Sequence, residues 1–191
     1  IQGYAVLSTI FDVKIDDIKQ ILSGSSKLVS SGLIELSFGS HADLTDALRP
    51  LNDRFLHHLI DNADAHKDLF KTEWRQVPAS TLTWESYKHL EPMISAVREY
   101  AKACIANPGS GGNILLYGPP GTGKTELTRL IGDCLEVPVF EVSSEDKDGD
   151  SMIPHERIRS LRAAKTVLND QRAILVFDEV EDVFGAKSSG P

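Results

Sequence analysis

The 191-residue chain has few cysteines and no long hydrophobic run. Its only cysteines, Cys104 and Cys134, lie far apart and have no histidine at the spacing of a metal site. This excludes a disulfide framework and a Cys/His zinc module. No apolar stretch approaches the ~20 residues that a membrane helix needs, and no secretory signal pattern is present. We therefore expect a reducing, cytoplasmic location and no membrane segment.

Basic residues are also scarce, since 20 Lys and Arg stand against 28 Asp and Glu, giving a net charge of −8. A general attraction to nucleic acid or to an anionic membrane is therefore not expected. The six histidines are scattered, and their spacing predicts no metal site. The acidic run over 145–150 has Arg157 where a Ca²⁺ loop counted from Asp146 would need a bidentate Glu, so it predicts a solvated loop.

The most informative stretch is residues 118–125, where Gly-Pro-Pro-Gly-Thr-Gly-Lys-Thr completes a G-x-x-x-x-G-K-T phosphate loop. Its glycines allow the backbone to curl with amides pointing inward, where side chains would block a phosphate. The apolar run Ile114–Tyr117 predicts a strand before the loop, and apolar residues at helical spacing over 126–135 predict a helix after it. Because a helix N-terminus favours an anion, the stretch predicts a nucleoside triphosphate site.

Two side chains of the phosphate loop have specific expected roles. Lys124 is placed to reach the β- and γ-phosphates, and Thr125 offers its hydroxyl to Mg²⁺. The residues expected to contact the nucleotide are Gly118, Pro119, Pro120, Gly121, Thr122, Gly123, Lys124, Thr125 and Glu126.

A second candidate site follows the apolar run Ala173–Phe177, which predicts a strand buried on both faces of a parallel sheet. A carboxylate at the C-terminal edge of such a strand lies beside a phosphate loop, where Asp178 can hold Mg²⁺ through water. Glu179 can orient and deprotonate the attacking water. Taken alone, the pair could equally be a surface turn after a strand. Beside the phosphate loop it predicts ATP hydrolysis with Mg²⁺.

These motifs resemble those of the AAA+ ATPases, over about residues 82–185. Residues 118–125 have the form of phosphate loop typical of that family, and Asp178–Asp182 looks like its second acidic motif, with Glu181 where Asp is common. Trp84–Leu90 is similar to the segment that lines the family's adenine pocket. The resemblance implies adenine contacts from Tyr87 and His89.

The resemblance further implies a three-layer α/β core with a parallel sheet, and a Mg-ATP-driven machine that remodels other macromolecules, usually as a homo-oligomeric ring. In the family the polar sensor, the arginine finger and the helical lid follow the acidic motif. Because the chain begins at Ile1 rather than Met, we expect a fragment of a longer protein. Because none of these later groups can be assigned in the few residues after the acidic motif, we expect the fragment to be weak or inactive as an ATPase on its own. The family's pore loop usually carries an aromatic residue, which Asp148–Ile153 lacks, so threading of polypeptide is not predicted.

The sequence pattern predicts a small, mostly α, accessory domain over 1–70, a linker over 71–83 and the core over 84–191. In the first 70 residues the order of helix, turn, helix, strand and turn is similar to a winged helix. The elements expected there are helices near 15–22, 27–31, 43–48 and 53–60, a strand over 33–36 and a turn over 37–40. In the core they are a helix over 91–105, a strand over 137–142 and a helix over 155–169.

A winged helix raises the possibility of DNA binding, but its recognition segment offers only Lys27. Duplex binding needs several phosphate contacts from Lys or Arg. We therefore expect residues 1–70 to contact a protein partner or the chain's own core through apolar residues such as Leu33, Phe38 or Phe55, with structural packing and nucleic-acid binding as alternatives. For the whole protein, the alternatives to remodelling are a nucleotide-gated switch or scaffold, a DNA-linked ATPase and a small-molecule kinase.

Overall fold

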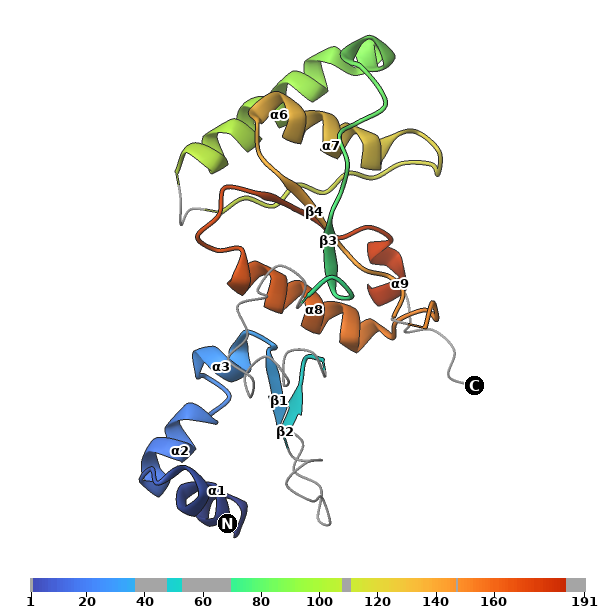
Figure 1. Cartoon of the computed structure of the whole chain (residues 1–191). Helices are drawn as coiled ribbons and strands as arrows, with labels where there is room; N and C mark the ends of the chain where they lie inside the picture. Colours follow the sequence, from blue (N-terminus) through green and yellow to red (C-terminus); the bar gives the residue numbers. More distant parts are fainter. Residues whose placement is uncertain (1, 37–47, 53–69, 108–110, 147, 185–191) are drawn as a thin grey trace.

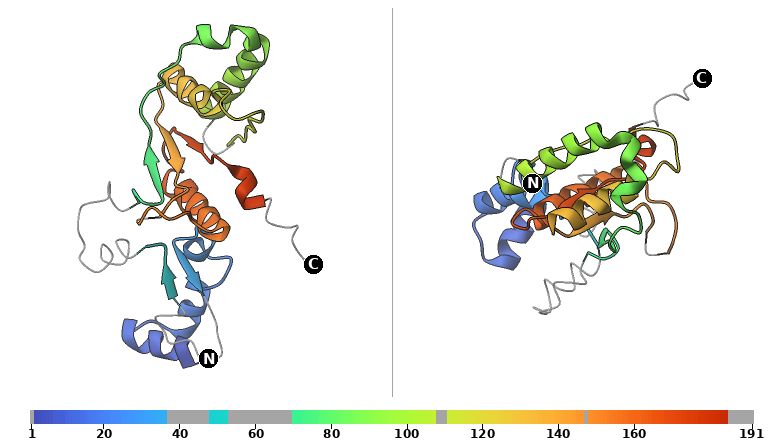
Figure 2. Two further views of the ribbon diagram at one scale, coloured as in Figure 1. Left: turned by 90° about the vertical axis from the view of Figure 1, so that its right-hand side faces the viewer. Right: turned by 90° about the horizontal axis from the view of Figure 1, so that it is seen from above.

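The computed structural model describes residues 2–36, 48–52, 70–107, 111–146 and 148–184 (Figure 1). The molecule is elongated, with the N-terminal helices at one end and a pair of long helices at the other (Figures 1 and 2). Among the described residues, none of the helices has both the length and the apolar character needed to cross a membrane.

The N-terminal part, which we call the N-terminal unit, consists of the described residues between 2 and 52. Three helices come first, α1 (Gln2–Phe11), α2 (Ile15–Ile21) and α3 (Lys27–Ser30). Two short strands then pair antiparallel, β1 (Ile34–Leu36) and β2 (Leu48–Pro50).

Local signals explain the boundaries of α3. The Ser26 hydroxyl accepts a hydrogen bond from the backbone N–H of Val29 at 3.2 Å and caps the first turn. Gly32, at φ 78°, then provides the left-handed residue that ends the helix. The predictions of α2, α3 and β1 are thereby confirmed.

The winged-helix interpretation stays a prediction, because the connection between β1 and β2 lies outside the described residues. The predicted turn at 37–40, most of the helix at 43–48, the helix at 53–60, and Phe38 and Phe55 lie there too. Leu48, expected to end a helix, instead begins β2.

The core contains a three-stranded sheet in the order β3-β4-β5, formed by β3 (Trp74–Gln76), β4 (Val139–Val142) and β5 (Ile174–Val176). β4 and β5 are parallel, as predicted, whereas β3 runs antiparallel to β4. β3 lies inside the stretch predicted as a linker, so the sheet is mixed rather than parallel. A three-residue strand with one buried side chain, Trp74, is too short to show a periodic pattern.

Helices cover both faces of this sheet (Figure 1). On one face lie the 3₁₀ helix η1 (Trp84–Leu90), α6 (Glu91–Ala106) and α7 (Lys124–Leu135). On the other lies α8 (Pro154–Val167), with the short α9 (Val180–Phe184) beside it. The predicted helices in 91–105, 126–135 and 155–169 are confirmed, as are the two strands in 137–142 and 173–177.

Two apolar clusters hold the layers together. The first joins η1, α6 and α7 to the sheet, and its buried members are Tyr87, Ile94, Ala101, Leu127, Leu130 and Ile131. The second joins α8 to the opposite face, and its buried members are Trp74, Ala163, Ala164 and Leu168. Ile174 packs on the first cluster and its neighbour Leu175 on the second, so β5 is covered on both faces, as its apolar run predicts.

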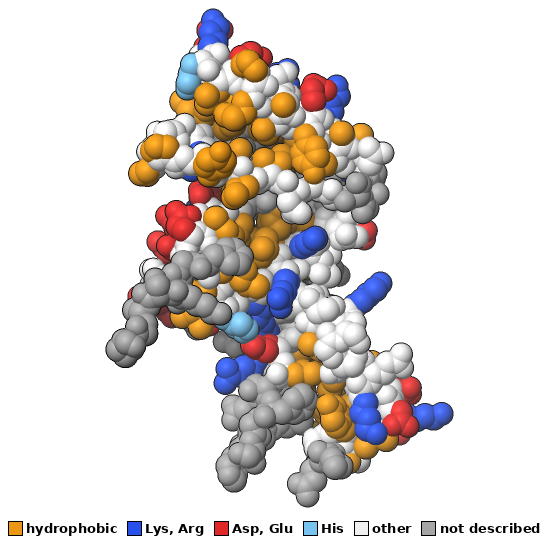
Figure 3. Space-filling model, turned by 180° about the vertical axis from the view of Figure 1, so that it is seen from behind, with side chains coloured by type: hydrophobic (Ala, Val, Ile, Leu, Met, Phe, Trp, Pro, Cys, Tyr) orange, Lys and Arg blue, Asp and Glu red, His pale blue; other side chains and the backbone are white. Residues whose placement is uncertain are grey.

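The strand predicted over Ile114–Tyr117 is not formed. A strand is stabilised by ladder hydrogen bonds to a neighbour, and none of the described strands pairs with this segment. Only Leu116 packs against the first cluster, while Leu115 and Tyr117 are 71% and 89% exposed. Hydrophobic side chains are also visible on the back of the half of the molecule that holds α6 and α7 (Figure 3).

Arg159 of α8 attaches the N-terminal unit to the core. Its guanidinium donates to the backbone carbonyls of Gly32 at 2.8 Å and Arg49 at 2.5 Å, and lies 3.7 Å from a Glu35 carboxylate oxygen. The fit is close, because a Cβ on Gly32 would stand 2.8 Å from the carbonyl oxygen of Arg159. Leu33 packs beside it on the α8 cluster. Leu33 thus contacts the chain's own core, one of the two options that the sequence leaves open.

We expect Arg159→Ala to lower the free energy of unfolding of the 191-residue chain by roughly 1–3 kcal/mol, because hydrogen bonds from a charged donor are lost. Urea denaturation measures it. Lys165→Ala is the matched control, since Lys165 is exposed on the same helix. Equal stability of the two variants would show that Arg159 does not hold the units together.

Candidate nucleotide-binding site

The phosphate loop has the backbone that its glycines predict. Gly118, Gly121 and Gly123 all have positive φ, at 148°, 76° and 82°. At Gly123 a side chain is excluded twice, because a Cβ there would also stand 2.8 Å from the Tyr87 hydroxyl. α7 begins directly afterwards at Lys124, so the loop leads into a helix N-terminus, as expected for a site that binds an anion.

Lys124 lies at the loop itself. Its ammonium donates to the backbone carbonyls of Gly118 at 3.1 Å and Pro119 at 2.9 Å. The Thr122 hydroxyl also donates to the Pro119 carbonyl, at 2.9 Å. The cationic group and the exposed loop backbone therefore form one surface, with the charge that a polyphosphate requires.

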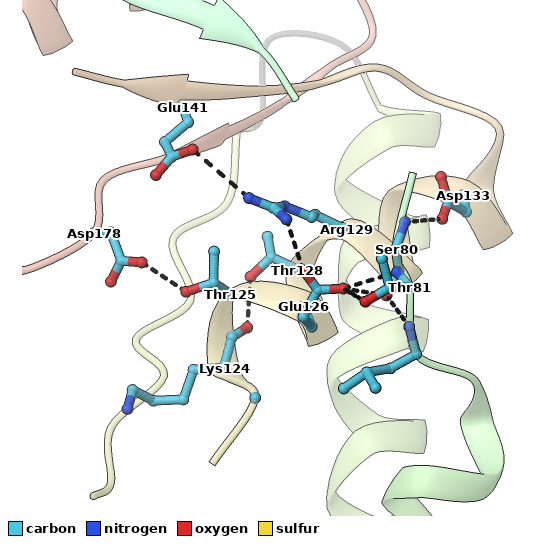
Figure 4. A network of polar contacts seen from close by, with 12 residues as sticks. Ser80, Thr81, Lys124, Thr125, Glu126, Thr128, Arg129, Asp133, Glu141 and Asp178 are labelled. Atoms are coloured by element: carbon cyan, nitrogen blue, oxygen red, sulfur yellow. Dashed lines mark hydrogen bonds and ion pairs between the residues drawn. The ribbon is translucent and has the colours of Figure 1, made fainter. Parts of the chain in front are cut away.

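The two sequence motifs meet through Thr125 and Asp178. The Thr125 hydroxyl donates to Oδ2 of Asp178 at 2.6 Å, although the residues are far apart in the chain (Figure 4). The other carboxylate oxygen of Asp178 accepts the backbone N–H of Glu179 at 2.9 Å. The predicted metal pair is thus brought together, with a hydroxyl and a carboxylate oxygen, both of the hard type that Mg²⁺ prefers.

Glu179 has an unusual backbone conformation for a residue with a side chain. Its φ is 51°, in the left-handed region, which for a non-glycine residue costs on the order of 1–3 kcal/mol. Glu179 is exposed and borders a cavity of about 290 Å³. The loop around Met152, the start of α8 and the helix α9 line the rest of this cavity. The predicted base is therefore in a strained position beside open space.

Arg157 is a residue of this site that sequence reasoning missed. It lies in the first turn of α8 and is only 3% exposed. Its guanidinium donates to the backbone carbonyls of Asp178 at 2.6 Å and Glu179 at 3.2 Å, and lies 4.6 Å from the centre of the Phe177 ring. The sequence signal that could have identified Arg157 as buried is helical spacing, since Arg157 lies on the same face of α8 as the buried Ser160 and Ala164.

The two residues predicted for the adenine pocket lie differently. Tyr87 is buried in the first apolar cluster, and its hydroxyl donates to the carbonyl of Gly123 at 2.8 Å. Burial, and then the charge of Glu126, raise the pKa of the Tyr87 phenol. His89 is exposed on η1. Tyr87 therefore supports the phosphate loop from beneath, and the adenine contacts of both residues stay predictions.

Glu126 uses its carboxylate away from the loop (Figure 4). Its Oε2 accepts hydrogen bonds from the Ser80 hydroxyl at 2.9 Å and from the Thr81 backbone N–H at 2.9 Å, and its Oε1 pairs with Arg129 at 2.6 Å. The Thr81 backbone first, and then Ser80, lower the pKa of Glu126. A nucleotide contact from Glu126 would therefore come from its backbone N–H.

Residues 114–191 match the model of a family described as ATPase family associated with various cellular activities (AAA). These 78 of the 191 residues are therefore similar to an AAA domain, a likeness that agrees with the α/β arrangement of the sheet and its helices. The match begins at the segment before the loop and includes the acidic motif.

Several curated proteins are similar to part of the chain. Replication factor C large subunit of Nanoarchaeum equitans is 36% identical over 80 residues, which cover 42% of this chain and 18% of that protein. ATP-dependent zinc metalloprotease FtsH of Trieres chinensis is 33% identical over 107 residues, 56% of this chain and 16% of the relative. Spastin of Anopheles gambiae is 27% identical over 120 residues, which cover 62% of this chain and 14% of that protein. The chain therefore spans less than one fifth of the length of each relative. No solved structure matches it.

We expect Glu126→Gln to lower the free energy of unfolding at neutral pH, on the order of 1 kcal/mol, because charge-assisted bonds from Ser80, Thr81 and Arg129 weaken. Since the folded-state pKa of Glu126 is lowered, its contribution is present above the ordinary carboxyl pKa of about 4.3 and is lost as the pH falls through the lower folded value. The difference in free energy of unfolding between the wild type and the variant, which we call the stability gap, should therefore become smaller in acid.

Urea denaturation at pH 7 and below about pH 4 measures this gap. Glu99→Gln, an exposed change on α6, is the control. A gap that stays constant with pH would refute the role assigned to the Glu126 carboxylate.

Proposed function

We propose that this chain is the nucleotide-binding part of an AAA+ ATPase that binds and hydrolyses Mg-ATP. The contact between Thr125 and Asp178 supports this most directly, because it joins the phosphate loop to the acidic motif at 2.6 Å. A surface turn after a strand, the alternative for Asp178 and Glu179, would not require a partner on the first turn of α7.

The proposed roles follow from where the groups lie. Lys124 and the loop amides bind the β- and γ-phosphates and offset their charge. Glu179, next to Asp178, takes a proton from the attacking water as it adds to the γ-phosphorus in line with the leaving oxygen. Catalysis in this class depends mostly on placing these groups and on electrostatic stabilisation.

The donor set fits a magnesium ion. Thr125 and Asp178 present oxygen ligands from two elements, and Mg²⁺ usually binds one or two protein oxygens and keeps several waters. When bound, the ion would supply positive charge that offsets the negative charge developing on the phosphate oxygens. In the protein, Asp178 holds the Thr125 hydroxyl in place through the same carboxylate that binds the Glu179 N–H.

For the whole protein we propose ATP-driven remodelling of a macromolecular partner, most consistent with a protein, by a homo-oligomeric ring. The relatives' names support an ATP-dependent machine but differ in what they describe: a replication factor, a zinc metalloprotease and spastin. The acidic net charge of −8 favours a protein partner over nucleic acid. Both cysteines carry free thiols, which is compatible with the cytoplasmic location that stays a prediction.

Lys124→Ala should weaken Mg-ATP binding by roughly 10–100-fold, because a hydrogen bond between two charged groups is lost. Isothermal titration of the 191-residue chain measures the affinity. Lys102→Ala, an exposed change on α6, is the control for net charge. Equal affinities for the Lys124 variant and the wild type would refute the proposed site.

Two substitutions in the acidic motif separate binding from chemistry. In the full-length protein, Glu179→Gln should keep Mg-ATP affinity within about threefold and lower turnover by roughly 10²–10⁴-fold, the share of a positioned base. Asp178→Asn should instead weaken binding that depends on Mg²⁺. Nucleotide titration and phosphate release measure the two effects. Wild-type turnover in Glu179→Gln would mean that another residue is the base.

A further inference from the structure

Three backbone polar groups at Glu179 have hydrogen-bond partners: its N–H, its carbonyl and the preceding carbonyl. Its N–H donates to Asp178 Oδ1 at 2.9 Å. Its carbonyl accepts from Arg157 at 3.2 Å and from the Asp182 N–H at 3.2 Å, and the preceding carbonyl accepts from Arg157 at 2.6 Å. The peptide groups on both sides of a residue with φ 51° are therefore fixed, and Arg157 is the side chain that bonds to both.

Arg157 occupies a place where stability alone would not favour a charge. It is 3% exposed, and its Nε has no hydrogen-bond partner among the described residues. Its position in the first turn of α8 puts a cation at the positive end of the helix dipole. A buried charge with an unmatched donor stabilises a protein less than a well-packed apolar residue of similar size. Its contacts with the acidic motif provide a different reason for an arginine.

Side-chain packing does not substitute for the hydrogen bonds from Arg157 to the Asp178 and Glu179 carbonyls. The side of Glu179 that faces the loop around Met152 borders the cavity of about 290 Å³, which Arg157 also lines. Without the guanidinium, the peptides flanking Glu179 would lose two of the hydrogen bonds that oppose relaxation of its strained φ. Such a relaxation would turn the Glu179 carboxylate but leave the phosphate loop unchanged.

We propose that Arg157 is a positioning residue for ATP hydrolysis, which holds the Asp178-Glu179 backbone so that the Glu179 carboxylate is aimed at the attacking water. The inference rests on the proposed ATPase function. It makes a separate prediction, because Arg157 acts through Glu179: in the described part of the chain its hydrogen bonds and ring contact involve Asp178, Glu179 and Phe177, and not Lys124 or Thr125. Its loss should therefore change turnover and not affinity.

Arg157→Met tests this, because Met keeps an unbranched apolar side chain over Phe177. Arg157→Lys is the second variant, which keeps the charge but lacks the fork that reaches two carbonyls. Arg162→Met, an exposed change on the same helix, is the control. Hydrogen exchange of the nucleotide-free 191-residue chain should be about tenfold faster over residues 179–183 in both Arg157 variants, and unchanged over α7.

In the full-length protein, Arg157→Met should lower the single-turnover rate of hydrolysis by about 10–100-fold while the Kd for Mg-ATP changes by less than about threefold. Arg157→Lys should lower the rate as well, because its ammonium lacks the fork that reaches both carbonyls. Combined with Glu179→Gln, Arg157→Met should cause no further loss, because a residue that acts through Glu179 has no effect once the base is absent.

Unchanged exchange over 179–183, a matching loss of affinity, or additive losses in the double variant would each overturn the positioning role. A wild-type protein that neither binds nor hydrolyses Mg-ATP would instead overturn the proposed function, and the positioning role in hydrolysis with it. If exchange over residues 179–183 were still faster in the Arg157 variants of such a protein, Arg157 would stabilise the backbone of the acidic motif without a role in hydrolysis.

Discussion

The hydrogen bond between Thr125 and Asp178 is the interaction on which the rest of the site depends. It exists because β4 and β5 are parallel neighbours, so that β5 ends beside the first turn of α7. The apolar clusters on the two faces of the sheet hold these elements in place. The burial of apolar side chains therefore positions a polar contact that neither motif could make alone.

α8 connects this site to the N-terminal unit through two arginines that are two residues apart. Arg157 binds the carbonyls of the acidic motif, and Arg159 binds those of Gly32 and Arg49. Residues two apart on a helix point to different faces, so one rigid element contacts both parts of the molecule. Small residues at Ala163 and Ala164 allow the same helix to lie close to Trp74 and the sheet.

Several predictions from the sequence are confirmed because their signals are local. The helix after the phosphate loop follows from helical spacing, and α3 from its capping residues. The burial of β5 on both faces follows from its apolar run. The strand at Ile114–Tyr117 is wrong for a physical reason: its composition suits a strand, but no described strand lies beside it to complete the hydrogen bonds. β3 was missed because its role comes from its neighbour β4 and from the burial of Trp74.

The sequence by itself determined the chemistry of the candidate site: a glycine-rich loop with Lys124 and Thr125, and a carboxylate pair after an apolar run. These motifs are recognisable because phosphate and Mg²⁺ require particular groups at short, fixed spacings. Only the tertiary structure decided that Thr125 and Asp178 meet, that Glu126 turns to Ser80 and Thr81, and that Arg157 holds the backbone of Glu179. Those contacts join residues that are distant in the chain, so they depend on the packing of whole helices against the sheet rather than on any local pattern.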